Sequence, residues 1–203
     1  MRTPRHDNIT WQDKVALRLN ALRLIDGEPV ICETHGGQGD IYAAAYTHVR
    51  SGIVFEKDPS KATFLARQRP SWAVYEADCV RTLGQGAGRH LTFNLLDLDP
   101  YDSCWEAMEA FFGSKRPFAD RMVVAVNDGL RHHLRGGGGW HVHVMEPFAE
   151  RYGNHNLFAH YLQIAEELTG ELVAKAGYRV TFFDGYHTGV EKKMTHFLAV
   201  LEK

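Results

Sequence analysis

The sequence has few of the features that mark secreted, membrane or disulfide-rich proteins. It holds only three cysteines, Cys32, Cys79 and Cys104, and none of them forms a Cys-x-x-Cys pair. This spacing argues against a disulfide scaffold and a cysteine zinc site, and it fits a reducing cytoplasm. No run reaches the roughly 18 apolar residues that cross a bilayer, and residues 1–7 lack the apolar core of a secretory signal. We therefore expect a cytoplasmic protein that does not bind membranes.

An excess of charge of one sign is also absent. The 203 residues include 23 Lys and Arg against 25 Asp and Glu, which gives a net charge of −2. This balance disfavours binding to nucleic acid through charge alone, although it leaves room for a local basic patch. With 44% hydrophobic residues, the chain fits one soluble domain of ordinary size.

The sequence does contain short apolar runs that alternate with helical patterns, which is typical of a parallel α/β sheet. Each run is followed by a polar residue, and ligands of such sheets bind beyond the carboxyl ends of the strands. The predicted strands are residues 30–32, 52–55, 72–75, 91–96 and 122–126. The predicted helices are residues 11–25, 58–69, 104–112 and 156–176. In the first helix, the predicted apolar face consists of Val15, Leu19, Leu22 and Ile25.

Two further strands are predicted at residues 178–183 and 194–201. Their connection is too short for a helical crossover, so they should form an antiparallel hairpin. We therefore expect an α/β fold with a seven-stranded, doubly wound sheet whose last strand is antiparallel. Residues 1–27 are predicted to be an N-terminal helical segment, and residues 28–203 the α/β domain, with an insert loop at 129–147.

A glycine-rich turn follows the first predicted strand. Residues 33–39 read Glu-Thr-His-Gly-Gly-Gln-Gly and precede a helical stretch. Glycines let a backbone approach a ligand closely, and a helix N-terminus favours negative charge. A tight turn without a ligand is the alternative interpretation at this point.

Acidic residues follow the second and third predicted strands. Glu56 offers two carboxylate oxygens, which suit the two hydroxyls of a ribose. The alternative role, capping a helix, fits Asp58 better, because Pro59 follows it. Asp78 can accept a hydrogen bond from the exocyclic amine of adenine, with an ordinary loop acid as its alternative. Because neighbouring strands end at the same edge of a sheet, we expect these acids to lie close together.

The fourth predicted strand ends in the string Asp97-Leu98-Asp99-Pro100-Tyr101. Proline restricts the residue before it to an extended conformation. Asp99 should therefore point outward at the edge of the sheet, with Tyr101 beside it as a platform for stacking. The alternative is a strand that simply ends in a turn.

Together these features resemble the class I S-adenosylmethionine (SAM)-dependent methyltransferases over about residues 28–203. The antiparallel seventh strand distinguishes that Rossmann-like family from nicotinamide-binding proteins. The resemblance implies SAM as cofactor, with Glu33 near its methionine part, Glu56 on the ribose and Asp78 on the adenine. His35 stands where the family's loop has its first glycine. The cofactor-binding residues implied are Glu33, His35, Gly36, Gly37, Gly39, Glu56, Lys57, Asp78, Cys79 and Asp97.

The string around Asp99 is similar to the Asp/Asn-Pro-Pro-Tyr/Phe motif of methyltransferases that act on exocyclic amines of bases. Its longer form, residues 97–103, is similar to the tRNA guanine-N2 dimethyltransferases, from which it departs at Asp102 and Cys104. The resemblance implies that Asp99 and the Pro100 carbonyl accept hydrogen bonds from the amine, while Tyr101 stacks on the base. The amine then attacks the methyl group in line, and the protein mainly positions the reactants. These three residues are the predicted catalytic residues, and no metal is required.

A basic segment, residues 113–143, carries five Lys and Arg against two Asp. It suits contact with phosphates and stacking on bases of RNA or DNA, with a solvated loop as the alternative. The glycine-rich residues 135–140 within it are expected to be mobile. Four nearby histidines, His132, His133, His141 and His143, form too loose a pattern for us to predict a zinc site.

The sequence thus predicts a SAM-dependent methyltransferase that modifies an exocyclic amine of a nucleic-acid base. One alternative is the same chemistry on a small-molecule or protein amine. Another is a nicotinamide-dependent oxidoreductase, in which the glycine loop and Glu56 would also serve. A third is a binding module without turnover, which the unusual His35 suggests. The oligomeric state is not predicted.

Overall fold

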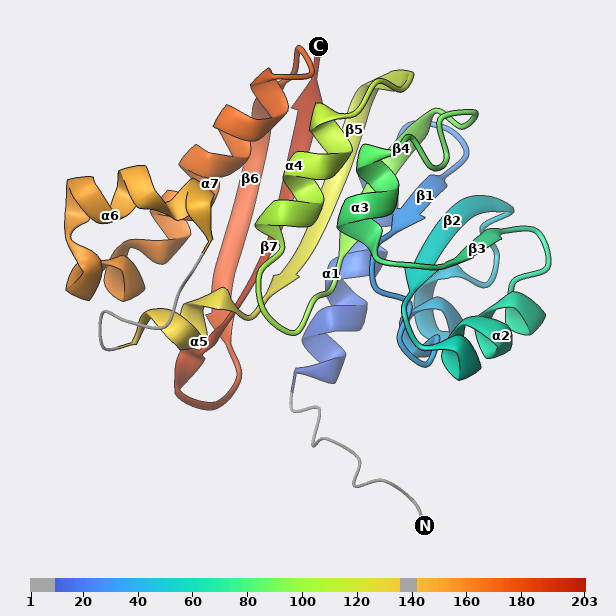
Figure 1. Ribbon diagram of the computed structural model, residues 1–203, viewed down its shortest axis with the longest axis horizontal. Coiled ribbons are helices and arrows are strands. Elements are labelled where there is room, and N and C mark those ends of the chain that lie inside the picture. The colour runs from blue at the N-terminus through green and yellow to red at the C-terminus, as the bar shows by residue number, and fades with distance from the viewer. Residues whose placement is uncertain (1–9, 136–141) are drawn as a thin grey trace.

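In the computed structural model, residues 10–135 and 142–203 are described, and within them seven strands form one sheet (Figure 1). The strand order is β3-β2-β1-β4-β5-β7-β6, and β7 runs antiparallel to both of its neighbours. The predicted α/β fold with an antiparallel last strand is therefore confirmed. The strands are β1 (Val30–Glu33), β2 (Ser51–Glu56), β3 (Ala73–Glu76), β4 (Phe93–Leu98), β5 (Phe118–Asp128), β6 (Arg179–Thr188) and β7 (Met194–Glu202).

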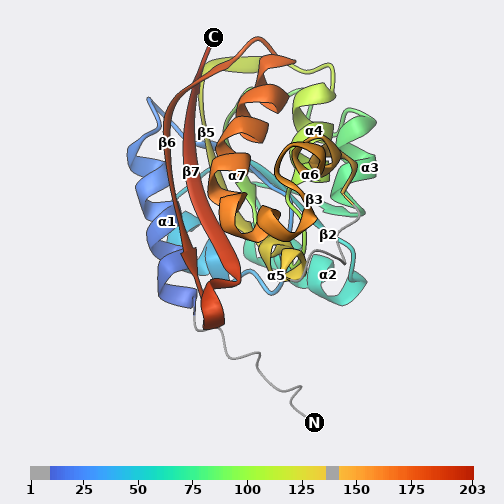
Figure 2. The same cartoon turned by 90° about the vertical axis from the view of Figure 1, so that its left-hand side faces the viewer.

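Helices cover both faces of the sheet. Figure 1 shows α3, α4 and α7 in front of it and α1 behind it, and Figure 2 shows the same layers edge-on. The helices are α1 (Trp11–Arg23), α2 (Pro59–Gln68), α3 (Cys79–Gly84), α4 (Trp105–Gly113), α5 (Leu130–Leu134), α6 (Glu146–Tyr152) and α7 (Leu157–Ala174). Single turns are η1 (Tyr42–Tyr46), η2 (His143–Met145), η3 (Asn154–Asn156) and η4 (Val190–Lys192).

The hydrophobic core has two parts, one on each face. The central strands are buried on both sides, as expected for parallel strands covered by helices. One part packs α3, α4, α6 and α7 on the sheet. It includes five residues that share one face of α7, which are Leu157, Tyr161, Ile164, Leu168 and Leu172. The other part joins α1, η1 and α2 to the opposite face.

Local signals explain where several helices begin. The Asp58 carboxylate accepts hydrogen bonds from the backbone amides of Ser60 and Lys61 at the start of α2, and Pro59 is the first residue of that helix. Asp78 caps α3 in the same way through the Arg81 amide. The cap predicted at Asp58 is confirmed.

Three of the four residues predicted for the apolar face of the first helix, Val15, Leu22 and Ile25, are partly buried and pack against the core, and only Leu19 departs from the prediction. The structure buries Leu17, Arg18 and Ala21, while Leu19 is 39% exposed. The buried face of α1 thus includes a charged residue, Arg18, whose buried partner in the sheet is Asp97.

The segment predicted as an insert loop, residues 129–147, contains helical structure. Leu130 and Leu134 are one turn apart and both buried, which fixes α5 on the core. The predicted mobile residues 136–140, together with His141, lie outside the described residues. In the rest of the chain, no helix combines the length and apolar character needed to cross a bilayer.

The C-terminal hairpin is longer than predicted. Residues 185–188, which fall in the connection between the two predicted strands, continue β6, because Thr188 still pairs with Met194 of β7. The turn itself spans residues 189–193, where Glu191 and Lys192 have left-handed φ angles of 55° and 54°.

Candidate functional site

The carboxyl ends of the parallel strands meet at one edge of the sheet, the lower edge in Figure 1. Backbone hydrogen bonds join the segments that follow them. The Thr34 amide donates to the Asp97 carbonyl at 3.0 Å, and the Gly36 amide to the Phe55 carbonyl at 2.9 Å. The Ala77 amide donates to the Glu56 carbonyl at 3.0 Å. The residues after β1, β2, β3 and β4 therefore lie together, as the sequence predicts.

Glu56 supports the glycine loop. Its Oε2 accepts a hydrogen bond from the Gly37 amide at 2.9 Å, and its Oε1 accepts one from the Asp58 amide at 2.9 Å. The loop needs its glycines, because a Cβ at Gly36 would lie 2.5 Å from the Leu65 side chain. Gly39 has a φ of 77°, and a Cβ there would lie 2.5 Å from Gln68. The carboxylate is partly exposed, so its remaining lone pairs are open to a ligand.

Asp78 lies at the start of α3, beside Lys57. The two side chains form an ion pair, and Lys57 is 70% exposed. The hydrogen bonds from Lys57 and the Arg81 amide hold the pKa of Asp78 below its ordinary value. Asp78 therefore presents a partly exposed, ionised carboxylate next to Glu56.

His35 and Cys79 lie between these acids. The His35 Nδ1 is 2.7 Å from the Thr34 hydroxyl, and its Nε2 is 3.8 Å from the Cys79 Sγ. Burial, together with the Lys57 charge, lowers the pKa of His35. Burial also raises the pKa of the Cys79 thiol to about 11. Both groups are therefore neutral at physiological pH, and neither adds charge to the site.

Glu33 faces the protein interior. Its carboxylate is 2% exposed and forms an ion pair with Arg69, which is fully buried. The Arg69 guanidinium lies 4.3 Å above the Tyr42 ring and 5.3 Å from the Trp72 ring. The structure thus does not bring this acid to the open edge where Glu56 and Asp78 lie.

Asp97 is also enclosed. Its Oδ1 accepts a hydrogen bond from the Arg18 Nη2 at 2.5 Å, and its Oδ2 accepts one from the Tyr46 hydroxyl at 2.8 Å. Arg18 is fully buried and Asp97 is 1% exposed. This pair fastens α1 to the end of β4. The sequence analysis missed it, and the signal was an arginine within an otherwise apolar helix face.

Asp99 lies two residues further on, at the open edge. Its Oδ1 accepts hydrogen bonds from the Lys14 ammonium at 2.6 Å and from the Asn127 Nδ2 at 2.9 Å. The Arg18 Nη2 is 3.9 Å from its Oδ2. Among the described residues, no hydrogen bond reaches Oδ2. Burial opposes ionisation, but the Arg18 and Lys14 charges outweigh it and hold the pKa of Asp99 below its ordinary value.

Tyr101 projects into solvent beside Asp99, with 85% of its surface exposed. The turn that carries it rests on Gly129. The Gly129 amide donates to the Asp102 carbonyl at 2.8 Å, and a Cβ at Gly129 would lie 2.0 Å from the Tyr101 carbonyl oxygen. Only glycine therefore allows the turn to approach the start of α5 so closely. Pro100, which separates Asp99 from Tyr101 in the sequence, is buried.

Asp128, at the end of β5, is enclosed beneath α5. It accepts hydrogen bonds from the Leu130 amide and the Tyr161 hydroxyl, and Tyr161 in turn accepts one from the Trp105 indole at 2.9 Å. Burial raises the pKa of Asp128 to about 7. This carboxyl supports α5 from below and does not face the open edge.

The Asp128 environment predicts a pH effect on stability. Because the folded pKa lies above the unfolded value, the stabilisation is complete below the unfolded pKa and is lost as the pH rises toward 7. As the pH rises from about 5 to 8, the free energy of unfolding should fall less in Asp128→Asn than in the wild type, by on the order of 2–3 kcal/mol. Urea denaturation at both pH values measures this. Asp120→Asn, at the exposed start of β5, is the control, and an equal pH dependence in all three proteins would contradict the prediction.

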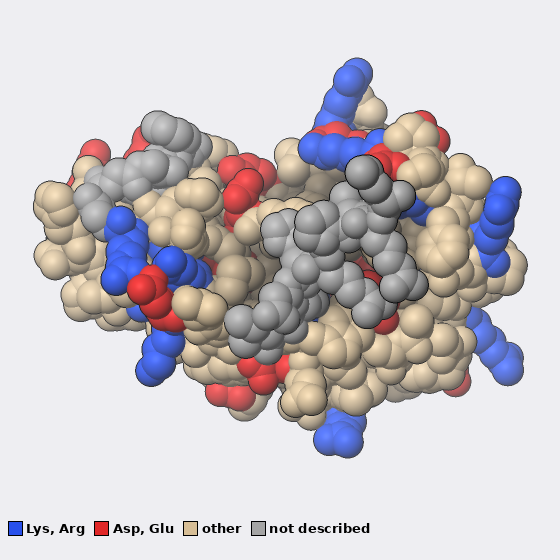
Figure 3. Space-filling model, turned by 90° about the horizontal axis from the view of Figure 1, so that it is seen from below, with Lys and Arg blue, Asp and Glu red and all other residues tan. Residues whose placement is uncertain are grey.

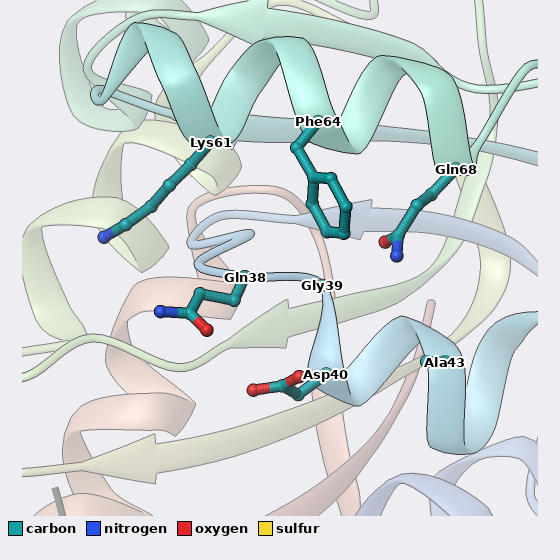
Figure 4. A pocket seen from close by; sticks show the side chains of 7 residues that line it. All are labelled: Gln38, Gly39, Asp40, Ala43, Lys61, Phe64 and Gln68. Carbon is teal, nitrogen blue, oxygen red and sulfur yellow. The ribbon is translucent and has the colours of Figure 1, made fainter. Parts of the chain in front are cut away.

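A separate cleft of about 330 Å³ opens beside the glycine loop. Figure 4 shows Phe64 of α2 pointing toward Gly39, with Lys61 and Gln38 on one side of it and Gln68 on the other. The cleft is lined by none of the acidic residues predicted to bind cofactor. It therefore lies outside the edge that holds Glu56, Asp78 and Asp99.

Residues 10–135 and 142–203 contain no group of three or more His, Cys, Asp or Glu side chains placed to hold a metal ion. His133 instead lies 3.1 Å from Asp102, and His143 lies 3.0 Å from Glu109. His141 is outside the described residues.

Comparisons with known proteins concern the fold. The sequence matches no family model, and no curated protein matches it. Among solved structures, the chain is similar to Trm1 from Pyrococcus horikoshii with S-adenosyl-L-methionine, with a TM-score of 0.66 and 12% identity. That match covers 100% of this chain but 56% of the other, so this chain spans little more than half of that protein's length.

Two other similar structures have lengths closer to that of this chain. TYW2 from M. jannaschii with AdoMet has a TM-score of 0.59 and 12% identity, with 97% of this chain and 77% of the other covered. The N-methyltransferase NodS from Bradyrhizobium japonicum with S-adenosyl-L-homocysteine has a TM-score of 0.59 and 10% identity, with 98% and 89% covered. The chain therefore has the Rossmann-like fold of methyltransferases whose structures contain SAM or its demethylated product.

Proposed function

We propose that this protein transfers a methyl group from SAM to an exocyclic amine. The observation that carries the proposal is Asp99, an ionised carboxylate at the end of β4 whose Oδ1 accepts two hydrogen bonds, while no hydrogen bond from the described residues reaches its Oδ2. It stands beside Pro100 and the exposed Tyr101, in a fold shared with structures that contain SAM. One similar protein is described as an N-methyltransferase, which agrees with an amine as acceptor.

The residues at the edge fit a nucleoside cofactor. Glu56 has lone pairs for the ribose hydroxyls, and Asp78 can accept a hydrogen bond from the adenine amine. At its glycines, the loop has no side chain to keep a ligand away from the backbone. The space beside Gly37 is open, since nothing lies within 4 Å of the position that a Cβ would take there. His35, which is neutral and partly exposed, lies beside the buried Cys79. Lys57 holds Asp78 in place.

Glu33 and Asp97 take supporting roles in this proposal. Glu33, before the glycine loop, pairs with the buried Arg69. Asp97, in β4, pairs with the buried Arg18. They fix the two segments that touch cofactor and acceptor, and they do not contact the ligands themselves.

Bound SAM supplies an electrophilic methyl group. The chain would position the amine that attacks it: as the N–CH3 bond forms, the S–CH3 bond breaks, S-adenosylhomocysteine leaves with the electron pair on sulfur, and the methylated amine loses a proton to solvent. The free Oδ2 of Asp99 and the carbonyl of Pro100 accept hydrogen bonds from the amine, which aims its lone pair at the methyl carbon. Lys14 and Asn127 hold the other oxygen of Asp99, so the carboxylate cannot rotate away. Tyr101 offers its ring for stacking.

A test of the cofactor site is Glu56→Gln. The amide removes the charge and one acceptor that the ribose hydroxyls need, so SAM affinity should fall by about 10- to 100-fold. Titration calorimetry with SAM measures this. Glu76→Gln is a matched control, because Glu76 pairs in register with Glu56 on β3 but is exposed. Equal affinity in the Glu56 and Glu76 variants would contradict the assignment.

We further propose that the amine belongs to a nucleic-acid base, because an exposed aromatic ring beside the acceptor carboxylate suits a flat heterocycle. The second candidate is an amine of a small molecule or protein. Incubation with methyl-labelled SAM and separate pools of RNA, DNA, protein and small amines distinguishes them. Binding of SAM without transfer to any pool would support a binding module. Binding of NADH in place of SAM would support an oxidoreductase.

A further inference from the structure

A group of cations lies where the β6–β7 turn meets α5. We call it the hairpin-tip patch, and it consists of Arg131 of α5, Arg135 directly after that helix, and Lys192 and Lys193 from the turn. Glu191 is the acidic residue of the turn, and it pairs with Arg135 and with Lys193. Figure 3 shows Lys and Arg side chains gathered around an acidic residue on the left of the face that carries the strand ends.

The hairpin-tip patch is fixed to the protein core. The Arg131 guanidinium lies 3.5 Å above the Phe158 ring and donates a hydrogen bond to the Lys192 carbonyl. Arg131 is only 6% exposed, so it anchors the turn onto α5. Arg135 and Lys192 are exposed above it, and Lys193 is partly exposed.

The positive charges of the patch contribute to lowered pKa values of two nearby histidines. Burial, followed by the charges of Arg131 and Lys192, lowers the pKa of His187 to about 4. Burial, followed by His133, Lys193 and Arg135, also lowers the pKa of His132, while Asp102 opposes this shift. Four cations with one carboxylate contrast with a whole chain that carries a net charge of −2.

The patch borders the acceptor site on two sides. On one side, α5 begins at Gly129, which supports the turn that carries Tyr101. On the other side, the end of β6 touches α1, because the Thr188 hydroxyl donates to Asp13 at 2.6 Å. The next residue of α1, Lys14, holds Asp99. Cations are therefore placed at the rim of the site where the amine would enter.

We propose that the hairpin-tip patch binds the phosphodiester backbone of a nucleic-acid substrate while the target base lies against Tyr101. Long cationic side chains on two adjoining elements suit repeated, spaced negative charges, and such contacts position a strand without reading its sequence. The contact with the base depends on the proposed methyl transfer, whereas the contact with phosphates does not.

The test compares two double variants at opposite ends of one hairpin. Lys192→Glu/Lys193→Glu reverses two positive charges of the patch. Arg179→Glu/Lys203→Glu makes the same charge change at the far end of the hairpin, where Arg179 pairs in register with Glu202. The probes are fluorescein-labelled single-stranded RNA and DNA of about 20 nucleotides, and anisotropy is read at several salt concentrations from about 50 mM upward. SAM affinity of each protein reports that it is folded.

The patch variant should bind at least about tenfold more weakly than the wild type. The slope of log affinity against log salt concentration should become shallower by about 0.7 for each phosphate that the variant no longer neutralises. The control should bind within about twofold of the wild type. The probe that binds more tightly identifies RNA or DNA as the substrate.

Equal weakening in both variants, or no binding by the wild type at low salt, would overturn the proposal. In the latter case, methylation of a small or protein amine would still show that the proposed chemistry holds.

Discussion

Replacing Asp99 with asparagine is expected to lower the rate of methyl transfer by about 10²- to 10³-fold, while SAM affinity stays within about twofold. The amide keeps the size of the side chain but removes the ionised oxygen that accepts the hydrogen bond from the amine. Asp99 makes no contact with Glu56 or Asp78, so the cofactor residues remain in place. Single-turnover assays and SAM titration measure the two quantities separately.

The control for this experiment is Asp26→Asn, because Asp26 is 80% exposed and lies beyond the end of α1. It should leave both quantities unchanged. A further variant, Lys14→Met, tests the charge on Asp99. Loss of the ammonium should raise the pKa of Asp99 and move the acid limb of the pH–rate profile to higher pH. Burial opposes the ionisation of Asp99, while the charges of Arg18 and Lys14 and the hydrogen bonds from Lys14 and Asn127 favour it. Unchanged turnover in Asp99→Asn would remove the proposed role.

The largest effect on stability is expected from Arg18→Met. The wild-type pair is enclosed, with Arg18 fully buried and Asp97 1% exposed. Removal of the guanidinium leaves the Asp97 carboxylate in the core with the Tyr46 hydroxyl as its remaining side-chain donor. We expect the free energy of unfolding to fall by about 3–5 kcal/mol, because an uncompensated charge stays buried. Urea denaturation measures this loss.

Two further variants separate charge from packing. Arg23→Met changes an exposed arginine of the same helix and should leave the denaturation midpoint nearly unchanged. Asp97→Asn in the Arg18→Met background removes the unpaired charge and should restore part of the loss. If Arg18→Met and Arg23→Met unfold at the same urea concentration, the ion pair between Arg18 and Asp97 contributes nothing to stability.

The outline of the fold could be predicted because its signals are local. Apolar runs that end in acids, the cap at Asp58 and the helical spacing in α7 each depend on residues close in sequence. The insert was less predictable, since α5 has five residues and owes its helix to the burial of Leu130 and Leu134.

The site could be predicted only in part, for a physical reason. A carboxylate after a strand is visible in the sequence, but the cation that pairs with it is not. Glu33 and Arg69 are 36 residues apart, and Asp97 and Arg18 are 79 residues apart. Of the four acids expected around the cofactor, Glu33 and Asp97 therefore face inward, and Glu56 and Asp78 are left partly exposed. Asp99, expected to point outward as the acceptor group, has a side chain that is 16% exposed, and its partner Lys14 could not be foreseen.

The position of α1 has a practical consequence for anyone shortening the protein. The helix covers one face of β5 and β7, and it supplies Arg18 to Asp97 and Lys14 to Asp99. A truncation that starts at residue 28 would keep every strand, yet it would uncover an apolar surface and strip the acceptor carboxylate of its cations. Such a product should aggregate when expressed, so affinity tags are better attached ahead of the helix than substituted for it.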